Sequence, residues 1–139
     1  MLGGRIKAPY FISNCDIIVE EDYSKIYNFH IAGQFSLTIV CVLKHQTVPY
    51  GVCEINDDGE LKGIKEKPEY DILINSGLYV INPDVLSFMP DNKPFDLTDL
   101  TVELKDNGEK VGVYPISEKS WIDIGQWEEY KKIVEILNI

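Results

Sequence analysis

The amino-acid sequence predicts an α/β fold in which a mainly parallel, mixed sheet carries a β-hairpin insertion. Apolar, strand-like segments alternate with segments whose apolar residues recur at helical spacing, and this alternation is typical of the class. A turn sequence, Asn-Asp-Asp-Gly at residues 56–59, separates two short strand-like segments, which indicates the hairpin. The 139 residues contain no internal repeat and no linker, so we expect a single domain over residues 1–139.

The chain opens with a predicted strand, a helix and a second strand. Residues 10–16 begin as a short apolar strand and end in polar residues. Asp22 is a suitable N-cap for the helix that follows, and Gly33 is expected to end that helix. Residues 37–43 form a continuous apolar run rich in β-branched side chains, as in a strand that is covered on both faces.

The middle of the chain predicts the hairpin, a further strand and a short helix. Residues 50–55 and 61–65 flank the turn sequence and form the hairpin. Residues 72–81 are an apolar strand interrupted by Gly77, where backbone is expected to come close to another group. The Asn-Pro pair at residues 82–83 then opens a short helix.

The last third predicts a helix, a strand and a final helix. Asp96 caps the first of these helices and Gly108 closes it. Residues 111–116 form the strand, and the final helix places its apolar residues on one stripe. We expect the aromatic residues at helical spacing to lie in the core, namely Tyr23, Tyr27, Trp127 and Tyr130.

Charge and composition exclude several classes of partner. With 45% hydrophobic residues, the chain is expected to be globular. Thirteen Lys and Arg stand against 23 Asp and Glu, and the net charge of −10 repels nucleic acid and anionic membranes. A ligand that carries phosphate therefore needs local positive charge or a metal ion.

The cysteines and the chain start favour a cytoplasmic protein. Cys15, Cys41 and Cys53 are odd in number and lack Cys-x-x-Cys spacing. They lie in apolar segments, where free thiols are common. No run approaches the 18 apolar residues of a membrane-spanning helix, and residues 1–7 lack the apolar segment of a signal peptide.

Two aspartates are candidate metal ligands. Asp123 lies between apolar neighbours in residues 121–125, where a carboxylate costs free energy unless a cation or a set of donors accompanies it. Asp16 directly follows the first strand, and ligands of open α/β sheets bind beyond the carboxyl ends of strands. Two carboxylates at one edge suit Mg²⁺, which keeps other positions for water and phosphate. Alternatively, Asp16 only ends a strand and Asp123 caps the last helix, and spacing does not decide between these interpretations.

A Glu-Lys-Pro sequence at residues 66–68 is a second candidate site. Pro68 disfavours helical backbone at Lys67 and pushes it toward an extended conformation. Lys67 would then offer a fixed point charge to a phosphate. Alternatively, Glu66 and Lys67 are a solvated pair at a strand end.

An amide and two glycines suit a hydroxyl-rich ligand. Asn75 offers a polar side chain, and Gly51 and Gly77 leave the backbone open. The alternative for Asn75 and Gly77 is a bulge in a strand, and Gly51 has the same ambiguity. The two histidines, His30 and His45, have no partner at ligand spacing, so the sequence supports neither a histidine-based metal site nor a catalytic triad.

Taken together, these motifs resemble the sugar-1-phosphate nucleotidyltransferase family, and most closely its mannose-1-phosphate guanylyltransferase-like branch. The resemblance covers nearly the whole chain and rests on the order of five motifs: Asn14-Cys15-Asp16, Tyr50-Gly51-Val52, Glu66-Lys67-Pro68, Asn75-Ser76-Gly77-Leu78-Tyr79 and Trp121-Ile122-Asp123-Ile124-Gly125. It implies a Rossmann-like fold and a reaction between a sugar 1-phosphate and a nucleoside triphosphate, with GTP preferred. The products are a nucleotide sugar and pyrophosphate.

The resemblance also implies roles for the candidate residues. Asp16 and Asp123 match the aspartates that hold Mg²⁺. Glu66 matches a residue that binds sugar hydroxyls, and Lys67 matches the one that faces the sugar phosphate. The positions that line the sugar pocket are matched by Gly51, Asn75 and Gly77.

One departure from the family pattern concerns the start of the chain. The family begins with a glycine-rich G-x-G-T-R loop that grips the triphosphate, and Gly3-Gly4-Arg5 stands too close to Asp16 for the βα units that separate the two motifs. We therefore expect a C-terminal portion of such an enzyme, with little turnover of its own and a tendency to self-associate. The alternative is a non-catalytic scaffold or regulatory subunit of the same fold.

Overall fold

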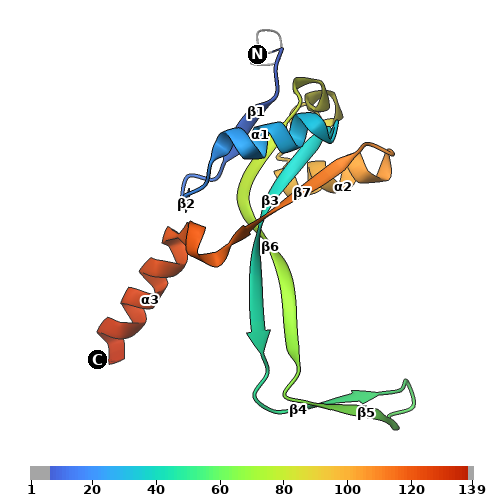
Figure 1. Cartoon of the computed structure of the whole chain (residues 1–139), viewed down its shortest axis with the longest axis vertical. Coiled ribbons are helices and arrows are strands. Elements are labelled where there is room, and N and C mark those ends of the chain that lie inside the picture. Colours follow the sequence, from blue (N-terminus) through green and yellow to red (C-terminus); the bar gives the residue numbers. More distant parts are fainter. Residues whose placement is uncertain (1–6, 138–139) are drawn as a thin grey trace.

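The computed structural model describes residues 7–137 (Figure 1), so the Gly3-Gly4-Arg5 sequence lies outside the described residues. Its main sheet contains four strands in the order β1-β6-β3-β7. Their bounds are Tyr10–Ser13 for β1, Leu37–Thr47 for β3, Glu69–Ile81 for β6 and Val111–Ser117 for β7. The α/β class and the mixed sheet are confirmed.

The expectation of a mainly parallel sheet is wrong. Strand β6 pairs antiparallel with both β1 and β3, and only β3 and β7 run parallel. The reason lies in the connections, since the hairpin between β3 and β6 reverses the chain. The path from β6 to β7 instead runs through the helical segments, which cross the sheet and restore the direction of β3.

Helices cover both faces of the main sheet. Helix α1 (Tyr23–Ala32) buries Ile26 against strand residues that include Val40 and Val80. On the other face, α2 (Leu97–Asp106) and the 3₁₀ helix η2 (Pro83–Phe88) cover a second cluster around Tyr79. The strands are thus apolar on both faces, as the continuous hydrophobic run of β3 predicts.

The predicted N-caps of α1 and α2 are both confirmed. Asp22 Oδ1 accepts a hydrogen bond from the Ser24 backbone N–H at 3.0 Å. Asp96 Oδ1 accepts one from the Asp99 N–H at 2.9 Å. Each carboxylate thereby satisfies a backbone donor that has no partner inside its helix.

Strands β3 and β6 continue beyond the main sheet as a two-stranded arm that ends in the hairpin (Figure 1). The hairpin consists of β4 (Gly51–Ile55) and β5 (Leu61–Glu66), which pair antiparallel as predicted. Gly59 closes its turn with φ at +87°, a conformation that glycine adopts without strain. No helix within residues 7–137 covers the arm, and many of its apolar side chains are exposed.

A second, two-stranded sheet was not predicted. It pairs β2 (Ile17–Val19) antiparallel with β8 (Trp121–Asp123), so that Ile17 lies opposite Asp123. The short 3₁₀ helix η3 (Glu118–Ser120) connects β7 to β8. Three-residue strands carry no readable periodicity, and the pairing joins segments far apart in sequence.

The last helix, α3 (Ile124–Leu137), projects from the body of the molecule (Figure 1). Its aromatic residues were expected in the core, but Trp127 is 56% exposed. Leu137, on the apolar stripe of the same helix, is 60% exposed. Tyr23 of α1 is likewise 43% exposed, whereas Tyr27 packs against the first core cluster. Helical spacing predicts which residues share one face of a helix. It does not predict whether another element packs against that face. The side chain of Tyr130 lies outside the described residues.

Within residues 7–137, no helix has the length and apolar character needed to cross a membrane.

Candidate functional site

A cleft of about 530 Å³ gathers four of the seven residues that the sequence singled out. Asp16 and Asp123 line it together with Asn75 and Gly77. Its walls come from the end of β1, the β2–β8 pair, the bend in β6 and the start of α2. The cleft therefore joins parts of the chain that are more than 100 residues apart.

The two aspartates meet around Gly125. A Cβ atom at Gly125 would lie 3.3 Å from Asp123 Oδ1 and 3.5 Å from Asp16 Oδ2. The β2–β8 pairing holds this arrangement, because Asp123 lies opposite Ile17 and the Ile124 N–H donates to the Asp16 carbonyl at 2.8 Å. Because Gly125 has no side chain, the space between the two carboxylates stays open.

Asp123 also caps helix α3. Its Oδ1 accepts hydrogen bonds from the backbone N–H groups of Gly125 at 3.1 Å and Gln126 at 3.4 Å. The cap and ligand interpretations are therefore compatible, because Oδ2 takes no part in capping. A carboxylate that is already fixed in this way needs little reorganisation to accept a cation.

The donor set fits a hard divalent cation better than a closed metal site. No group of three or more His, Cys, Asp or Glu side chains in the described part of the chain forms a metal-binding cluster. Asp16 and Asp123 together offer two carboxylates to a cation. Mg²⁺ is commonly held in this way, by one or two carboxylates with water and substrate phosphates completing its octahedron.

A bulge in β6 shapes the wall next to the aspartates. Strand β3 passes from the Val40–Leu78 pair to the Cys41–Asn75 pair, which leaves two residues of β6 outside the ladder. Gly77 in this bulge has φ at +90°, and a Cβ atom there would lie 2.6 Å from Asn14 Nδ2. The glycine is thus required both by the backbone conformation and by the contact.

Asn75 stabilises the same bulge. Its Oδ1 accepts from the Gly77 N–H at 2.9 Å, and its Nδ2 donates to the Tyr79 hydroxyl. The bulge interpretation of this segment is therefore what the structure contains. Each amide atom still has capacity for one further hydrogen bond to a ligand in the cleft.

Trp121 ties the bulge to the metal-binding candidates. Its indole Nε1–H donates to the Ser76 carbonyl at 3.1 Å, while the Ser76 hydroxyl donates to the Val40 carbonyl at 2.6 Å. This chain of contacts runs from β3 through β6 to β8. It fixes the position of Asp123, two residues after Trp121.

The other three predicted residues do not line the cleft. Gly51 and Glu66 are paired across the hairpin, and Lys67 follows directly on β5. In Figure 1 the hairpin lies at the far end of the arm from the main sheet. The structure thus separates Gly51, Glu66 and Lys67 from the two aspartates.

Lys67 also departs from the expected backbone. Its φ is +43°, a left-handed conformation, where Pro68 was expected to enforce an extended one. Only these two residues connect β5 to β6, so the chain must turn sharply there. The Lys67 N–H donates to the Tyr50 carbonyl at 3.2 Å, and the Val48 N–H donates to the Pro68 carbonyl at 3.0 Å. These bonds hold the turn and outweigh the local preference.

Sequence reasoning missed several residues of the cleft. Asn14, Asp96 and Thr98 contribute polar groups, and Phe95 and Trp121 contribute aromatic surface. Asp96 was recognised only as a helix cap. The sequence carried no signal that the start of α2 faces the same cleft as β8.

The cleft is acidic. Three of its lining residues are aspartates, namely Asp16, Asp96 and Asp123, and its described lining contains no Lys or Arg. A phosphate would be repelled by this lining unless a cation accompanied it. The cleft alone therefore suits hydroxyl groups and metal ions.

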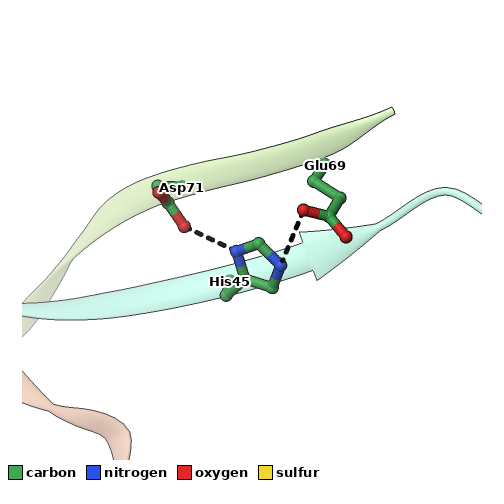
Figure 2. A network of polar contacts seen from close by, with 3 residues as sticks. All are labelled: His45, Glu69 and Asp71. Atoms are coloured by element: carbon green, nitrogen blue, oxygen red, sulfur yellow. Dashed lines mark hydrogen bonds and ion pairs between the residues drawn. The ribbon is translucent and has the colours of Figure 1, made fainter. Parts of the chain in front are cut away.

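A histidine with a raised pKa, His45, lies outside the cleft, on the arm (Figure 2). His45 Nδ1 donates to Asp71 Oδ1 at 2.6 Å, and its Nε2 lies 3.7 Å from Glu69 Oε2. The hydrogen bond to Asp71, followed by the negative charges of Asp71 and Glu69, raises the pKa of His45 above its usual 6.5. When it is protonated, the imidazole on β3 can pair with both of these carboxylates on β6.

Comparison with known proteins agrees with this architecture. A model of the family described as nucleotidyl transferase matches residues 3–138. Among curated relatives, a probable mannose-1-phosphate guanylyltransferase 1 of Oryza sativa is 31% identical over 88% of this chain and 34% of its own length. A mannose-1-phosphate guanylyltransferase catalytic subunit beta of Drosophila pseudoobscura is 27% identical over 88% of this chain and 33% of its own length.

A UTP–glucose-1-phosphate uridylyltransferase of Synechocystis is 29% identical over 86% of this chain and 33% of its own length. The chain thus spans about a third of the length of these curated relatives. Among solved structures, HddC of Yersinia pseudotuberculosis superposes with a TM-score of 0.59 at 25% identity. That superposition covers 97% of this chain and 58% of HddC. A complex of HddC with GMP-PN gives a TM-score of 0.51 at 26% identity, over 94% of this chain and 56% of HddC.

Proposed function

This chain belongs to the nucleotidyl transferase family, and from that membership we propose that it supplies the sugar-binding and metal-binding part of a sugar-1-phosphate nucleotidyltransferase. The reaction transfers a nucleotidyl group from a nucleoside triphosphate to a sugar 1-phosphate. The observation that carries the proposal is the pair of carboxylates, Asp16 and Asp123, on either side of Gly125 in a cleft lined by amide and hydroxyl groups.

The chemistry needs no covalent step on the protein. An oxygen of the sugar 1-phosphate forms a bond to the α-phosphorus of the triphosphate, while the bond from that phosphorus to the oxygen bridging to the β-phosphate breaks. Pyrophosphate leaves with the electron pair of that bond. Because two polyanions must approach each other, positioning and charge neutralisation are the main tasks of the protein.

The residues of the cleft have separate roles in the proposed reaction. Asp16 and Asp123 would hold Mg²⁺, which supplies positive charge to the phosphates when it is bound. The bulge formed by Asn75 and Gly77 would line the sugar. Lys67 would face the sugar phosphate and Glu66 would bind sugar hydroxyls, which requires the hairpin to approach the cleft.

GTP is the proposed donor. The names of the relatives from Oryza and Drosophila support a guanylyl donor and mannose 1-phosphate. The relative from Synechocystis is named for UTP and glucose 1-phosphate, which supports the wider reaction class rather than one base. The reducing cytosol remains the proposed location, because the free thiols of Cys15, Cys41 and Cys53 suit a reducing compartment.

The experiment is a panel assay of pyrophosphate release on the natural protein that carries this sequence. Each of four nucleoside triphosphates is combined with mannose 1-phosphate and glucose 1-phosphate, with and without Mg²⁺. We expect Mg²⁺-dependent release, greatest with GTP and mannose 1-phosphate. Release with no pair of substrates would contradict the proposal and favour the non-catalytic scaffold.

A further inference from the structure

Lys44 lies where strand β3 leaves the main sheet. The parallel pairing of β3 with β7 ends at Leu43, one residue earlier. The Lys44 side chain is only 30% exposed, and its Nζ atom lies 3.7 Å from Glu118 Oε1 and 5.7 Å from the centre of the Trp121 ring. An anion of η3 and an aromatic ring of β8 therefore hold this ammonium group in place.

The ammonium group of Lys44 has hydrogen-bonding capacity to spare. Lysine carries three N–H donors, and Lys44 Nζ makes no hydrogen bond with any residue of the described chain. Lys110 provides a comparison within the same molecule. Its Nζ also lies over an aromatic ring, 5.0 Å from the centre of Phe35, but it donates to the Gly33 carbonyl at 2.7 Å. Lys44 differs in that all its donors remain available to a ligand.

A second pocket connects Lys44 to the candidate metal site. Its volume is about 290 Å³, and Lys44 lines it together with Glu118, Trp121 and Asp123. Trp121 and Asp123 also line the acidic cleft, so the two spaces adjoin at these residues. Among the described residues Lys44 pairs with Glu118 and not with Asp123. The second pocket thus brings beside Asp123 a positive charge of the kind that the described lining of the cleft lacks.

We propose that Lys44 binds the phosphate of the sugar 1-phosphate, next to a cation held by Asp16 and Asp123. Because the chain carries a net charge of −10, a ligand with phosphate needs local positive charge. In the second pocket Glu118 and Asp123 together outweigh Lys44 by one negative charge, and a divalent cation on Asp123 makes that balance positive. This inference rests on the proposed function and names a further residue that binds its substrate.

Glu118 competes with the phosphate for Lys44. A phosphate oxygen that accepts from an ammonium group at about 2.7–2.9 Å makes a stronger contact than an ion pair at 3.7 Å. The Glu118 side chain is 53% exposed, so it can turn into solvent when a phosphate arrives. Exposed ion pairs contribute little to stability, so this exchange costs the fold little. Lys67 reaches the same phosphate only if the hairpin approaches the cleft, whereas Lys44 already borders it.

The test measures binding of mannose 1-phosphate and glucose 1-phosphate to this 139-residue chain by calorimetry in the presence of Mg²⁺. Lys44→Met removes the charge and keeps an unbranched side chain over Trp121. We expect it to weaken binding of both sugar phosphates about ten- to a hundredfold and by similar factors, because both carry the same phosphate. Glu118→Gln removes the competing carboxylate and should strengthen binding about two- to fivefold. Lys110→Met is the matched control and should leave affinity unchanged.

The opposite effects of Lys44→Met and Glu118→Gln separate phosphate binding from a structural role, because both substitutions break the same ion pair. Equal losses in the two variants would overturn the inference, since the ion pair would then act only through the fold. Unchanged binding in Lys44→Met, or a loss for only one of the two sugars, would also overturn it and leave the proposed function intact.

Titration with Mg²⁺ alone checks that the variants keep the site at Asp16 and Asp123. Lys44→Met should bind Mg²⁺ no more weakly than the unaltered chain, because it removes a positive charge near the carboxylates. A loss of Mg²⁺ affinity that matches the loss of sugar phosphate affinity would overturn the inference, since Lys44 would then act through the metal site. Failure of the unaltered chain to bind either sugar phosphate would contradict both this inference and the proposed function.

Discussion

At the scale of single residues, Asp123 caps helix α3 in a geometry that leaves it able to act as the proposed cation ligand, although sequence reasoning treated the two tasks as alternatives. Its Oδ1 caps α3 through Gly125 and Gln126, and the same carboxylate stands beside Asp16 across the open space at Gly125. A charge that is held by backbone donors is already oriented before a cation arrives. The local cost of ordering the side chain is thus met by the fold rather than by the ligand.

Replacing Asp123 by Asn separates these two tasks. Asparagine caps helices nearly as well as aspartate, so we expect the thermal unfolding midpoint to change little. The loss of a negative charge should weaken Mg²⁺ binding at least tenfold, since hard cations prefer carboxylate oxygen. Titration with Mg²⁺ followed by NMR chemical shifts measures this. Asp57→Asn, in the hairpin turn outside the cleft, is the control, and an equal loss in that variant would argue against a site at Asp123.

Substitution of Gly77, in the wall of the cleft, should destabilise the fold more than substitution of Gly59 in the hairpin turn. Alanine there must adopt φ near +90° and must displace Asn14, whose Nδ2 would lie 2.6 Å from the new Cβ atom. Gly59 has a similar φ of +87°, but a Cβ atom there would have nothing within 4 Å. The positive φ alone costs about 1–2 kcal/mol for a non-glycine residue. Urea unfolding should therefore show a larger loss for Gly77→Ala than for Gly59→Ala, and equal losses would contradict the contact with Asn14.

At the scale of elements, the arm formed by β3 and β6 depends on cross-strand contacts, because no helix in the described part of the chain covers it. His45 on β3 pairs with Asp71 and lies near Glu69, both on β6 (Figure 2). Two-stranded ribbons are marginally stable on their own in water. Contacts of this kind therefore have more influence on the arm than they would have in a covered sheet.

The pH dependence of the arm follows from the raised pKa of His45. A group whose pKa is higher in the folded state contributes stability that is fully present below its unfolded pKa and is lost as pH rises through the folded value. We thus expect hydrogen exchange in the arm, corrected for its intrinsic pH dependence, to be faster above the folded pKa of His45 than below the usual 6.5. NMR titration of the chain's two histidines measures that pKa directly, and Asp71→Asn should lower it. A pKa that Asp71→Asn leaves unchanged would contradict the pairing.

The hairpin must approach the cleft if Glu66 and Lys67 bind substrate. Cys53 of β4 is exposed, and Cys15→Ser would leave it as the exposed cysteine for labelling, since Cys41 is buried. Energy transfer from Trp121 in the cleft to a probe on Cys53, in a Trp127→Phe background, should increase when sugar 1-phosphate and Mg²⁺ are added. Unchanged transfer would remove Glu66 and Lys67 from the proposed site.

Local signals in the sequence predicted the local features of this fold well. The caps at Asp22 and Asp96 and the turn at Gly59 depend on neighbouring residues, and each is present in the structure. The pairing of β2 with β8 joins residues about 100 positions apart through three-residue strands, so no window of sequence contains it. General rules for α/β sheets predicted that Asp16 and Asp123 reach the same edge of the sheet. No local signal in the sequence indicated that Thr98 lines the same cleft.

At the scale of the whole molecule, two features oppose each other. The chain carries a net charge of −10, which disfavours contact between copies. Helix α3 nevertheless exposes apolar side chains such as Ile133, Ile136 and Leu137. Exposed apolar surface of this extent favours association when charge repulsion is screened.

We therefore expect the isolated chain to self-associate, and to do so more strongly at high salt than at low salt. Sedimentation velocity over a range of concentrations measures this, and Ile136→Lys should weaken the association because it places a charge on the 81% exposed position of α3. A monodisperse monomer at every salt concentration would contradict the expectation.

The central claim is that the cleft binds a sugar 1-phosphate through a divalent cation held by Asp16 and Asp123. The most direct measurement is calorimetric titration of mannose 1-phosphate into the chain with Mg²⁺, with EDTA, and with Mg²⁺ in the variants Asp16→Asn and Asp123→Asn. We predict saturable binding with Mg²⁺ that is lost with EDTA and in both variants. Binding that persists without a divalent cation, or in both variants, would contradict the claim.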